Sequence, residues 1–594
     1  MKTSKYVFAF LLFSLSSALT LQAQDTIKHR NVQVEREYRP VIHDAGKINS
    51  MPQVLEPNVT KEPADYSDFN MPLNADYNIH ILPAAELITE KPEDSKKGYA
   101  RLGFGNYLNT LADFAYPVIN TTDMRLDFSL NHLATFDSKM EHTTTKANLA
   151  FDIILLNALD FYAGLGGGHE HFNYYGNYYD DAHSAFNINS LDADYGHSIY
   201  LEKNRQGINS TPQLFNLNML SNDPSETLWR FNALVGVRSL PLSTNIRYQA
   251  ELQYKSFNSH NGINEKQVIT QAGISIPNEN DRLGLDFELN NLKYSSFTIP
   301  EFNFWKSYSV LTLNPYYGIE RPEYNVRLGF KTSLSFVHGR PIDPSLDVRA
   351  EWKAVPNYFS IYGGITGDYE VNTLDKIYTE NPYVYSDLRL NDTYTPYDFF
   401  AGIKVKPLYN LLLDFYVDSK RIDNQYFFVN KGYRLVNSPI AMPLASDSAI
   451  YSNRFNVVYS GASHVKMGFR ANYNFRNMVN VELKWAYNTW NVDTEKEAWN
   501  MPKQEVQLNT NVRITDYLTV TANVYYEGNR FAKLGNNAVQ MADKVDINLG
   551  IAYSYYNWLT VFGKINNVIN NQYQDYYGYN VQGTNMMIGA AVSF

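Results

Sequence analysis

Residues 246–255 read IRYQAELQYK, and apolar and polar side chains alternate along the whole stretch. The same period of two recurs over residues 124–131, 283–290, 479–488 and 545–554. Successive side chains of a β-strand point to opposite faces. Each of these segments therefore predicts a strand with one apolar face and one polar face.

The polar face of these strands favours a membrane barrel over a soluble sandwich. It carries charged or amide side chains in nearly every strand, and the expected strands exceed the usual length of about five or six residues. Aromatic residues recur near strand ends, as at Tyr254, Trp485 and Trp558. These features are typical of an all-β, transmembrane outer-membrane β-barrel, which must close because lipid cannot hydrogen-bond a free strand edge. A secreted soluble β-protein is the alternative.

Composition excludes several other classes of protein. The 594-residue chain has no cysteine, which excludes a disulfide framework, a thiolate metal site and a cysteine nucleophile. Its net charge of −10 disfavours a nucleic-acid partner. Its 15% of aromatic residues suits the interfacial girdles and outer loops of a barrel.

The first 97 residues differ from the rest of the chain. Lys2 and Lys5 precede an apolar run that ends near Ala23, so we expect residues 1–23 to be a cleaved signal peptide and the protein to be exported. The run is short for a membrane anchor, which is the alternative. Residues 24–97 hold seven of the 24 prolines, which disfavours helices and central strands. We expect a periplasmic segment there, either a solvated tail or a segment that folds against the barrel or a partner, and a barrel over residues 98–594.

Link lengths predict the topology of the barrel. Short links, such as 120–123, 321–323 and 515–516, alternate with long ones, as periplasmic turns alternate with outer loops in such barrels. The alternation predicts about 22 antiparallel strands, within a range of about 18–24, with both barrel ends in the periplasm. The long links are expected at 173–226, 371–394, 420–452, 529–541 and 569–583.

The end of the chain carries a family resemblance. Asn566-Asn567-Val568-Ile569-Asn570 is followed by Tyr573, by Tyr577-Gly578-Tyr579 and Gly583, and by a last strand ending in Phe594. This stretch resembles the C-terminal strands of the TonB-dependent receptor family. The resemblance implies a 22-stranded barrel in the outer membrane of a Gram-negative cell, uptake of a ligand, and Phe594 as a barrel assembly signal.

The chain also departs from that family. The family carries a plug domain before the barrel, whereas residues 24–97 are too short and too rich in proline for one, and they contain no convincing TonB box. TonB-type energy coupling is therefore in doubt. An empty barrel of this size would leak solutes, so the N-terminal segment, inward-folded loops or a partner protein must fill it.

Candidate site residues are few. His169 and His171 could bind metal with Asp180, Asp181 or His183, although such a pair also occurs by chance at lumen-facing positions. Two tyrosine-rich loops could contact a carbohydrate or protein, or could pack on themselves above the rim. Their candidate contact residues are Tyr174, Tyr175, Tyr178, Tyr179, Tyr576, Tyr577 and Tyr579.

Two functions fit these observations. The first is uptake or transport of a ligand across the outer membrane by a receptor-like barrel. The second is a plugless docking barrel, an accessory subunit of an envelope complex whose protein partner binds residues 24–97. No catalytic arrangement is found in the sequence, so we expect neither an enzyme nor a cofactor. We expect outer-membrane lipid to surround the barrel.

Overall fold

The computed structural model describes the following residues: 98–137, 140–155, 158–180, 185–186, 198–201, 225–240, 246–260, 262–296, 307–385, 388, 390–436, 449–476, 478–556 and 558–594. All of them belong to one unit of the chain, Ala45–Phe594, which is described by itself. The predicted signal peptide, residues 1–23, and the proline-rich segment, residues 24–97, lie outside the described residues.

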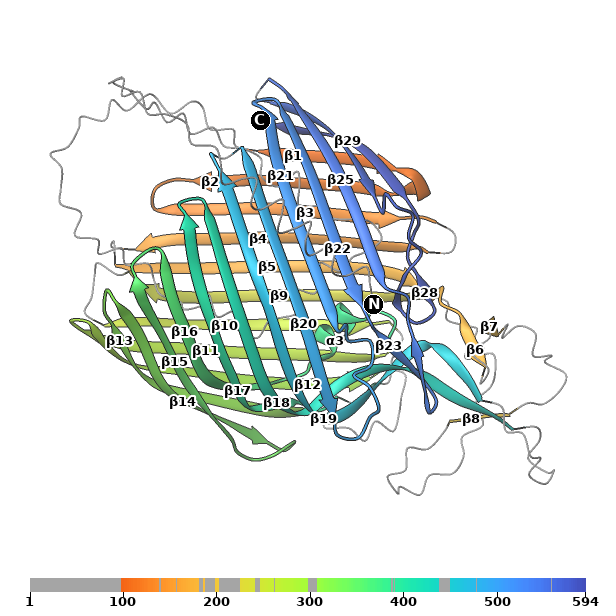
Figure 1. Ribbon diagram of the computed structural model, residues 1–594, viewed down its shortest axis with the longest axis horizontal. Coiled ribbons are helices and arrows are strands. Elements are labelled where there is room, and N and C mark those ends of the chain that lie inside the picture. Colours follow the sequence, from red (N-terminus) through yellow and green to blue (C-terminus); the bar gives the residue numbers. More distant parts are fainter. Residues whose placement is uncertain are drawn as a thin grey trace, which may run out of the picture. The chain divides into compact units, whose positions relative to one another are not determined.

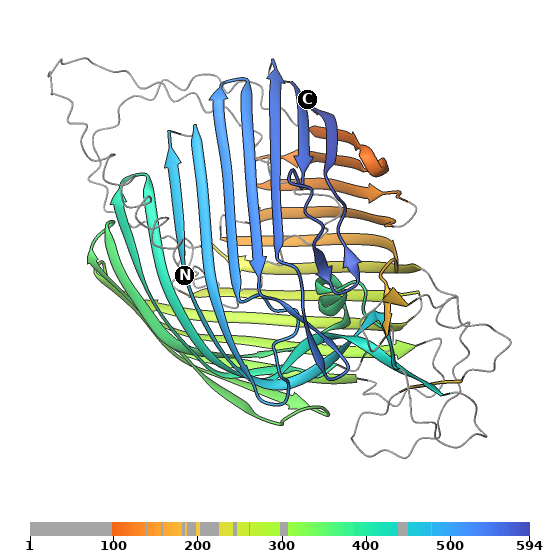
Figure 2. The same cartoon turned by 45° about the vertical axis from the view of Figure 1, so that its right-hand side comes forward.

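The described strands form a closed antiparallel barrel of 22 strands (Figures 1 and 2). Each strand pairs with the next along the chain, and the first, β1 (Tyr99–Gly105), also pairs with the last, β29 (Asn585–Ser593). Closure satisfies every strand edge, as a lipid surrounding requires. The predicted fold and the predicted number of strands are confirmed.

The other strands of the wall are, in order, β2 (Thr110–Asn120), β3 (Met124–Thr135), β4 (His142–Leu155), β5 (Leu159–Asn173), β9 (Ser225–Ser239), β10 (Arg247–Ser259), β11 (Ile263–Asn278), β12 (Asp281–Ser296), β13 (Ser307–Glu320), β14 (Tyr324–Phe336), β15 (Asp343–Val355), β16 (Phe359–Glu370), β17 (Thr393–Leu408), β18 (Leu411–Val436), β19 (Ala449–Phe475), β20 (Val479–Val492), β21 (Gln504–Thr515), β22 (Leu518–Gly528), β25 (Lys544–Tyr555) and β26 (Leu559–Asn566). The smaller described elements are the 3-10 turn η3 (Asn106–Leu108), β6 (Tyr178–Asp180), β7 (Ala185–Phe186), β8 (Ser198–Leu201), α3 (Leu374–Glu380), β23 (Phe531–Leu534), β24 (Asn537–Gln540), β27 (Gln574–Tyr576) and β28 (Tyr579–Asn580).

The two ends of the barrel differ in their links. At one end, here the turn end, strands are joined by short turns such as 121–123, 321–323 and 516–517. At the other, the loop end, the links include 371–392 and 567–584. Long loops face the outside of the cell in outer-membrane barrels. The predicted alternation therefore agrees with the observed topology.

The outer face of the wall is apolar. Large side chains stand exposed there on neighbouring strands, among them Leu102 at 57%, Leu283 at 59% and Ile588 at 68%. Exposed aromatics, such as Trp558 and Tyr409, lie at the turn end. An apolar band with aromatic residues at its border is what a bilayer requires of a barrel. Among the described residues, no helix is long and apolar enough to cross a membrane.

Tyrosines lock neighbouring strands together on the inner face. The ring of Tyr362 on β16 lies over Gly402 on β17, where any Cβ would collide with it, and its hydroxyl donates to Asp414 on β18 at 2.8 Å. Tyr162 repeats this arrangement over Gly236. Because each such tyrosine reaches across a glycine to a third strand, it fixes the register of three strands at once.

One predicted link is wrong. Residues 420–452 were expected to be a loop, but β18 continues to Val436 and β19 begins at Ala449. Pairing resumes after a bulge between Ile422 and Gln425, and the two strands extend beyond the wall as a long hairpin. We call its outer part, residues 425–436 and 449–460, the overhang. Both faces of the overhang carry apolar side chains, so the alternation with a period of two that marks the membrane strands is lost there.

Candidate functional site

A short helix lies inside the barrel near the loop end (Figure 2). It belongs to the link 371–392, whose described residues we call the inner lid. Thr373 begins the helix, because its hydroxyl accepts the Lys376 N–H at 3.2 Å. A seven-residue helix is unstable alone, so α3 depends on packing. Leu374, Ile377 and Tyr378 supply that packing and are all buried.

The inner lid is attached to one side of the wall by charged groups. Arg230 on β9 donates to Asp375 at 2.6 Å and also pairs with Glu170 on β5. Glu265 on β11 accepts the Leu374 N–H at 2.7 Å. Because Arg230 bridges two carboxylates from different elements, it joins the helix to the wall electrostatically.

The inner lid is also attached to the overhang, which continues β18 and β19. The Tyr426 hydroxyl of β18 donates to the Glu380 carboxylate. On β19, Phe455 forms a parallel bridge with Val384 and exchanges backbone hydrogen bonds with its neighbours. Eight strands, β10–β17, separate β9 from β18 around the wall. A segment that contacts both therefore reaches across the barrel at its loop end.

Asp392 ties the two ends of the inner lid together. It accepts the Asn372 N–H at 3.1 Å, the Tyr308 hydroxyl at 3.0 Å and the Tyr369 hydroxyl at 2.8 Å. Burial raises the pKa of the Asp392 carboxyl to about 6, because the charged form loses water, although these hydrogen bonds oppose the rise. The inner lid is thus a loop with a closed neck.

A trio of tyrosines from three different segments covers the inner lid. Tyr383 of the lid stacks on Tyr579 of the link 567–584, with ring centroids 3.6 Å apart and planes at 16°. Tyr175 meets the edges of both rings, at 5.8 and 5.0 Å. The Tyr579 hydroxyl donates to the Asn453 carbonyl of the overhang at 2.7 Å. The contacts join the lid, two loops and the overhang into one cap.

The structure brings most of the predicted contact tyrosines together in this cap. Tyr174, Tyr175, Tyr576 and Tyr579 belong to the same apolar cluster as α3. Tyr179 and Tyr577 pack in a second cluster with Leu534. These tyrosines thus contact one another, the lid and the overhang. Contact with a ligand stays a prediction, and it would require the cap to open. Tyr178 lies near Arg454 of the overhang.

The predicted histidine pair faces away from the lumen. The His169 ring packs against the exposed Trp229 ring, with centroids 4.4 Å apart, and His171 hydrogen-bonds the Thr227 hydroxyl at 2.8 Å. Glu170 between them faces inward to Arg230, so the pair must point outward. The expectation of lumen-facing positions was wrong. Within the described part of the chain, no group of three or more His, Asp or Glu residues is placed to hold a metal ion, and Asp181 and His183 lie outside it.

The residues that hold the inner lid were missed in the sequence. Arg230, Glu265 and Asp392 lie on three separate segments, and no local motif links them. The lid itself left a signal, because Thr373 precedes Leu374, Ile377 and Tyr378 in a short helical pattern within a recognised long link.

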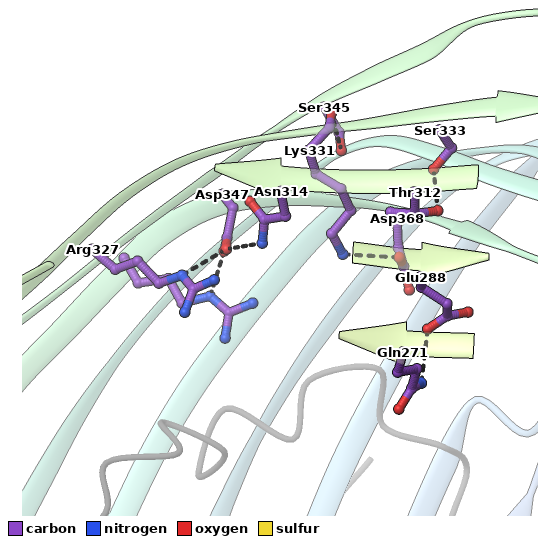
Figure 3. Close-up of polar contacts among 11 residues, drawn as sticks. Gln271, Glu288, Thr312, Asn314, Arg327, Lys331, Ser333, Ser345, Asp347 and Asp368 are labelled. Carbon is purple, nitrogen blue, oxygen red and sulfur yellow. Dashed lines mark hydrogen bonds and ion pairs between the residues drawn. The ribbon is translucent and has the colours of Figure 1, made fainter. Parts of the chain in front are cut away.

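Between the inner lid and the turn end, charged and amide side chains line the inner wall (Figure 3). Arg327 and Arg349 both donate to Asp347, at 2.9 and 2.8 Å, and Asn314 donates to it at 3.1 Å. Lys331 pairs with Asp368 at 3.0 Å on the same wall. The side chains of Figure 3 come from β11 to β16 and project to one face, so this wall presents paired charges to the interior.

Solved structures show the same architecture. Similar chains are those of the FpvAI–pyocin S2 complex (TM-score 0.57, 13% identity, 85% of this chain and 71% of that one) and of a mutant ferric enterobactin receptor, PfeA, of Pseudomonas aeruginosa with enterobactin (0.58, 12%, 85% and 82%). The ferripyoverdine receptor of the outer membrane of P. aeruginosa, bound to ferripyoverdine, is a third (0.56, 13%, 85% and 72%). The chain has the barrel fold of outer-membrane receptors.

That likeness concerns the fold, since the identities are low. No family model and no curated protein matches the sequence. The structure has the barrel that the resemblance of the C-terminal residues implied. The ligand and the energy source of this barrel are matters for the proposal below.

Proposed function

We propose that this receptor-like barrel resides in the outer membrane and takes part in the uptake or transport of a ligand across it. The closed barrel with an apolar outer face and a polar, charged inner wall carries the proposal. Such a wall suits water and polar solutes, as in other large barrels of the outer membrane. The likeness to receptors named for ferric enterobactin and ferripyoverdine supports it at the level of fold.

The proposal assigns the loop end to ligand selection. The cap tyrosines offer aromatic rings and hydroxyls of low conformational entropy, which suit recognition of carbohydrate or protein. They would contact the ligand once the cap opens. An envelope partner that binds residues 24–97 belongs to the docking alternative, which truncation of these residues tests, and TonB-type coupling stays in doubt.

A nutrient-limitation experiment tests the uptake proposal. Cells lacking the chain would be compared with complemented cells in three media: with iron supplied as a ferric siderophore, with an oligosaccharide as the only carbon source, and with a peptide as the only nitrogen source. We expect a growth defect confined to one medium and restored by the intact chain. Equal growth in all three media would contradict uptake.

The docking alternative predicts a different result. Affinity purification of the full chain and of a variant lacking residues 24–97 would compare their associated proteins. Loss of a stoichiometric envelope protein on truncation, together with equal growth in the three media, would favour an accessory subunit. An intact nutrient phenotype without any associated protein would favour uptake alone.

A further inference from the structure

The wall of the barrel is complete without the inner lid. Strands β9 to β13 pair in continuous register behind α3, and no strand of the wall depends on the lid for a partner. Between the described lid and the wall, backbone pairing is limited to the bridge between Val384 and Phe455. The lid could therefore leave the interior without opening the sheet, which would be forbidden in lipid.

The ion pair that holds α3 to β9 is of a kind that water can replace. The ion pair between Arg230 and Asp375 has partly exposed side chains, at 21% and 35%. Further hydrogen bonds run to Glu265, from Tyr426, and from the Tyr576 hydroxyl to the Glu380 carbonyl at 2.8 Å. Lys376 also pairs with Glu370 at 2.7 Å. Partly exposed ion pairs contribute little net stability, because each partner regains hydration when they separate. The apolar share of the attachment comes from one face of two helical turns.

The neck of the inner lid is held by several hydrogen bonds. Besides the bond to Asp392, the Asn372 side chain donates to the Asn391 carbonyl and to the Thr393 hydroxyl, both at 2.8 Å. These residues directly adjoin the ends of β16 and β17. A loop with a fixed neck moves as one body once the contacts of α3 and the bridge between Val384 and Phe455 are released.

We infer that the inner lid is the gate of this barrel: it closes the loop end from within, and it opens by swinging about its neck when α3 leaves Arg230 and Glu265. This inference rests on the proposed function, because only a barrel that conducts a ligand needs an open state. It adds that the gate is a loop of the barrel itself, built between two neighbouring strands of the wall.

Engineered cysteines test the gate, because the natural chain has none. Val384 and Phe455 are bridge partners, and the Cα atoms of paired strand residues lie about 5 Å apart, within the range of a disulfide. The full chain carrying V384C and F455C would be recorded in planar bilayers, oxidised and then reduced. It would also carry D375N and I377A, which weaken the grip of α3.

We expect the weakened chain to open at least about tenfold more often than the natural chain, chiefly because I377A removes a buried apolar side chain of α3. Oxidation of the cysteine pair should abolish these openings, and reduction should restore them. Each single-cysteine variant is the matched control and should not respond to oxidation. Equal opening of weakened and natural chains, or currents indifferent to oxidation, would overturn the inference.

A second measurement tests the gate even if the variant with four substitutions folds poorly. Ile377 is buried in the natural chain, so an I377C variant reacts with a membrane-impermeant maleimide only when the lid opens. Labelling of intact cells at a measurable rate, slowed when the V384C and F455C pair is oxidised in a variant with I377C, supports the gate. Absence of labelling in the natural background overturns it. Neither measurement uses a nutrient, so failure of the uptake proposal shows separately in the growth experiment.

Discussion

Gly98 and Phe594 exchange both of their backbone hydrogen bonds, 2.6 and 3.0 Å long, at the seam where the barrel begins and ends. The Phe594 ring lies over Gly98 so closely that no Cβ would fit there. It also stacks on Tyr116, with centroids 6.2 Å apart and planes at 18°. The last residue thus fixes the register of the closing pair β1 and β29 from the turn end.

Deletion of Phe594 should lower the yield of closed barrel. Removing it takes away two hydrogen bonds and a ring contact at the one pair of strands that joins distant ends of the chain. We expect the fraction of folded, heat-modifiable barrel in extracted membranes to fall several-fold. Phe330 is similarly exposed on the outer face, at 48%, and F330A is the control. Equal loss in both variants would mean that exposed apolar area, and not the seam, sets the yield.

A methyl group at Gly402 should destabilise the wall. G402A forces the Tyr362 ring away from its seat and from Asp414, and overpacking of this kind costs about 1–3 kcal/mol. Gly167 on β5 has open space where its Cβ would lie, so G167A is the matched control and should change stability by less than about 0.5 kcal/mol. Unfolding in denaturant, followed by tryptophan fluorescence, measures both. Equal midpoints for the two variants would contradict the interlock.

The membrane strands were predictable because lipid and lumen impose a strict period of two on each of them, as in residues 283–290. The overhang was not, because both of its faces are buried against cap segments and the alternation disappears. The face of His169 was misjudged for a related reason. Alternation shows that neighbouring side chains lie on opposite faces of a strand, but only the contact of Glu170 with Arg230 shows which face is the inner one. Arg230 and Glu265 were missed because their meeting with α3 depends on how a long loop folds back.

The inner lid, with its neck, should resist local unfolding better in mild acid than at neutral pH, because Asp392 belongs to the neck. Burial raises the pKa of the Asp392 carboxyl to about 6, above about 3.9 in an unfolded chain. The folded lid therefore binds this proton more tightly, and its stability falls as the pH rises from about 4 to about 6. The upper limit of the change is about 3 kcal/mol for two pH units.

Hydrogen exchange of the lid amides, corrected for the intrinsic pH dependence of exchange, measures this change. Protection of residues 374–380 should fall between about pH 4 and pH 6 in the natural chain and stay nearly constant in D392N, which has no proton to lose. Amides of β11, in the wall, serve as the internal reference. Rising protection with pH, or the same slope in D392N, would show that another group controls the lid.

Tyr383 and Tyr579 should stabilise the cap cooperatively. Their rings stack at 3.6 Å although they come from loops separated by most of the second half of the chain. Stacked aromatic pairs contribute about 0.5–1.5 kcal/mol beyond their buried area. In a double-mutant cycle of Y383A, Y579A and the double variant, the summed stability losses of the two single variants should therefore exceed the loss in the double variant by that amount.

Protection of the lid amides gives the free energies. As a control, Y383A would be combined with Y409A, because Tyr409 is 72% exposed at the turn end and should show no coupling. Additive losses for Tyr383 and Tyr579 would mean that the lid and the link 567–584 are held independently, and that opening one leaves the other in place.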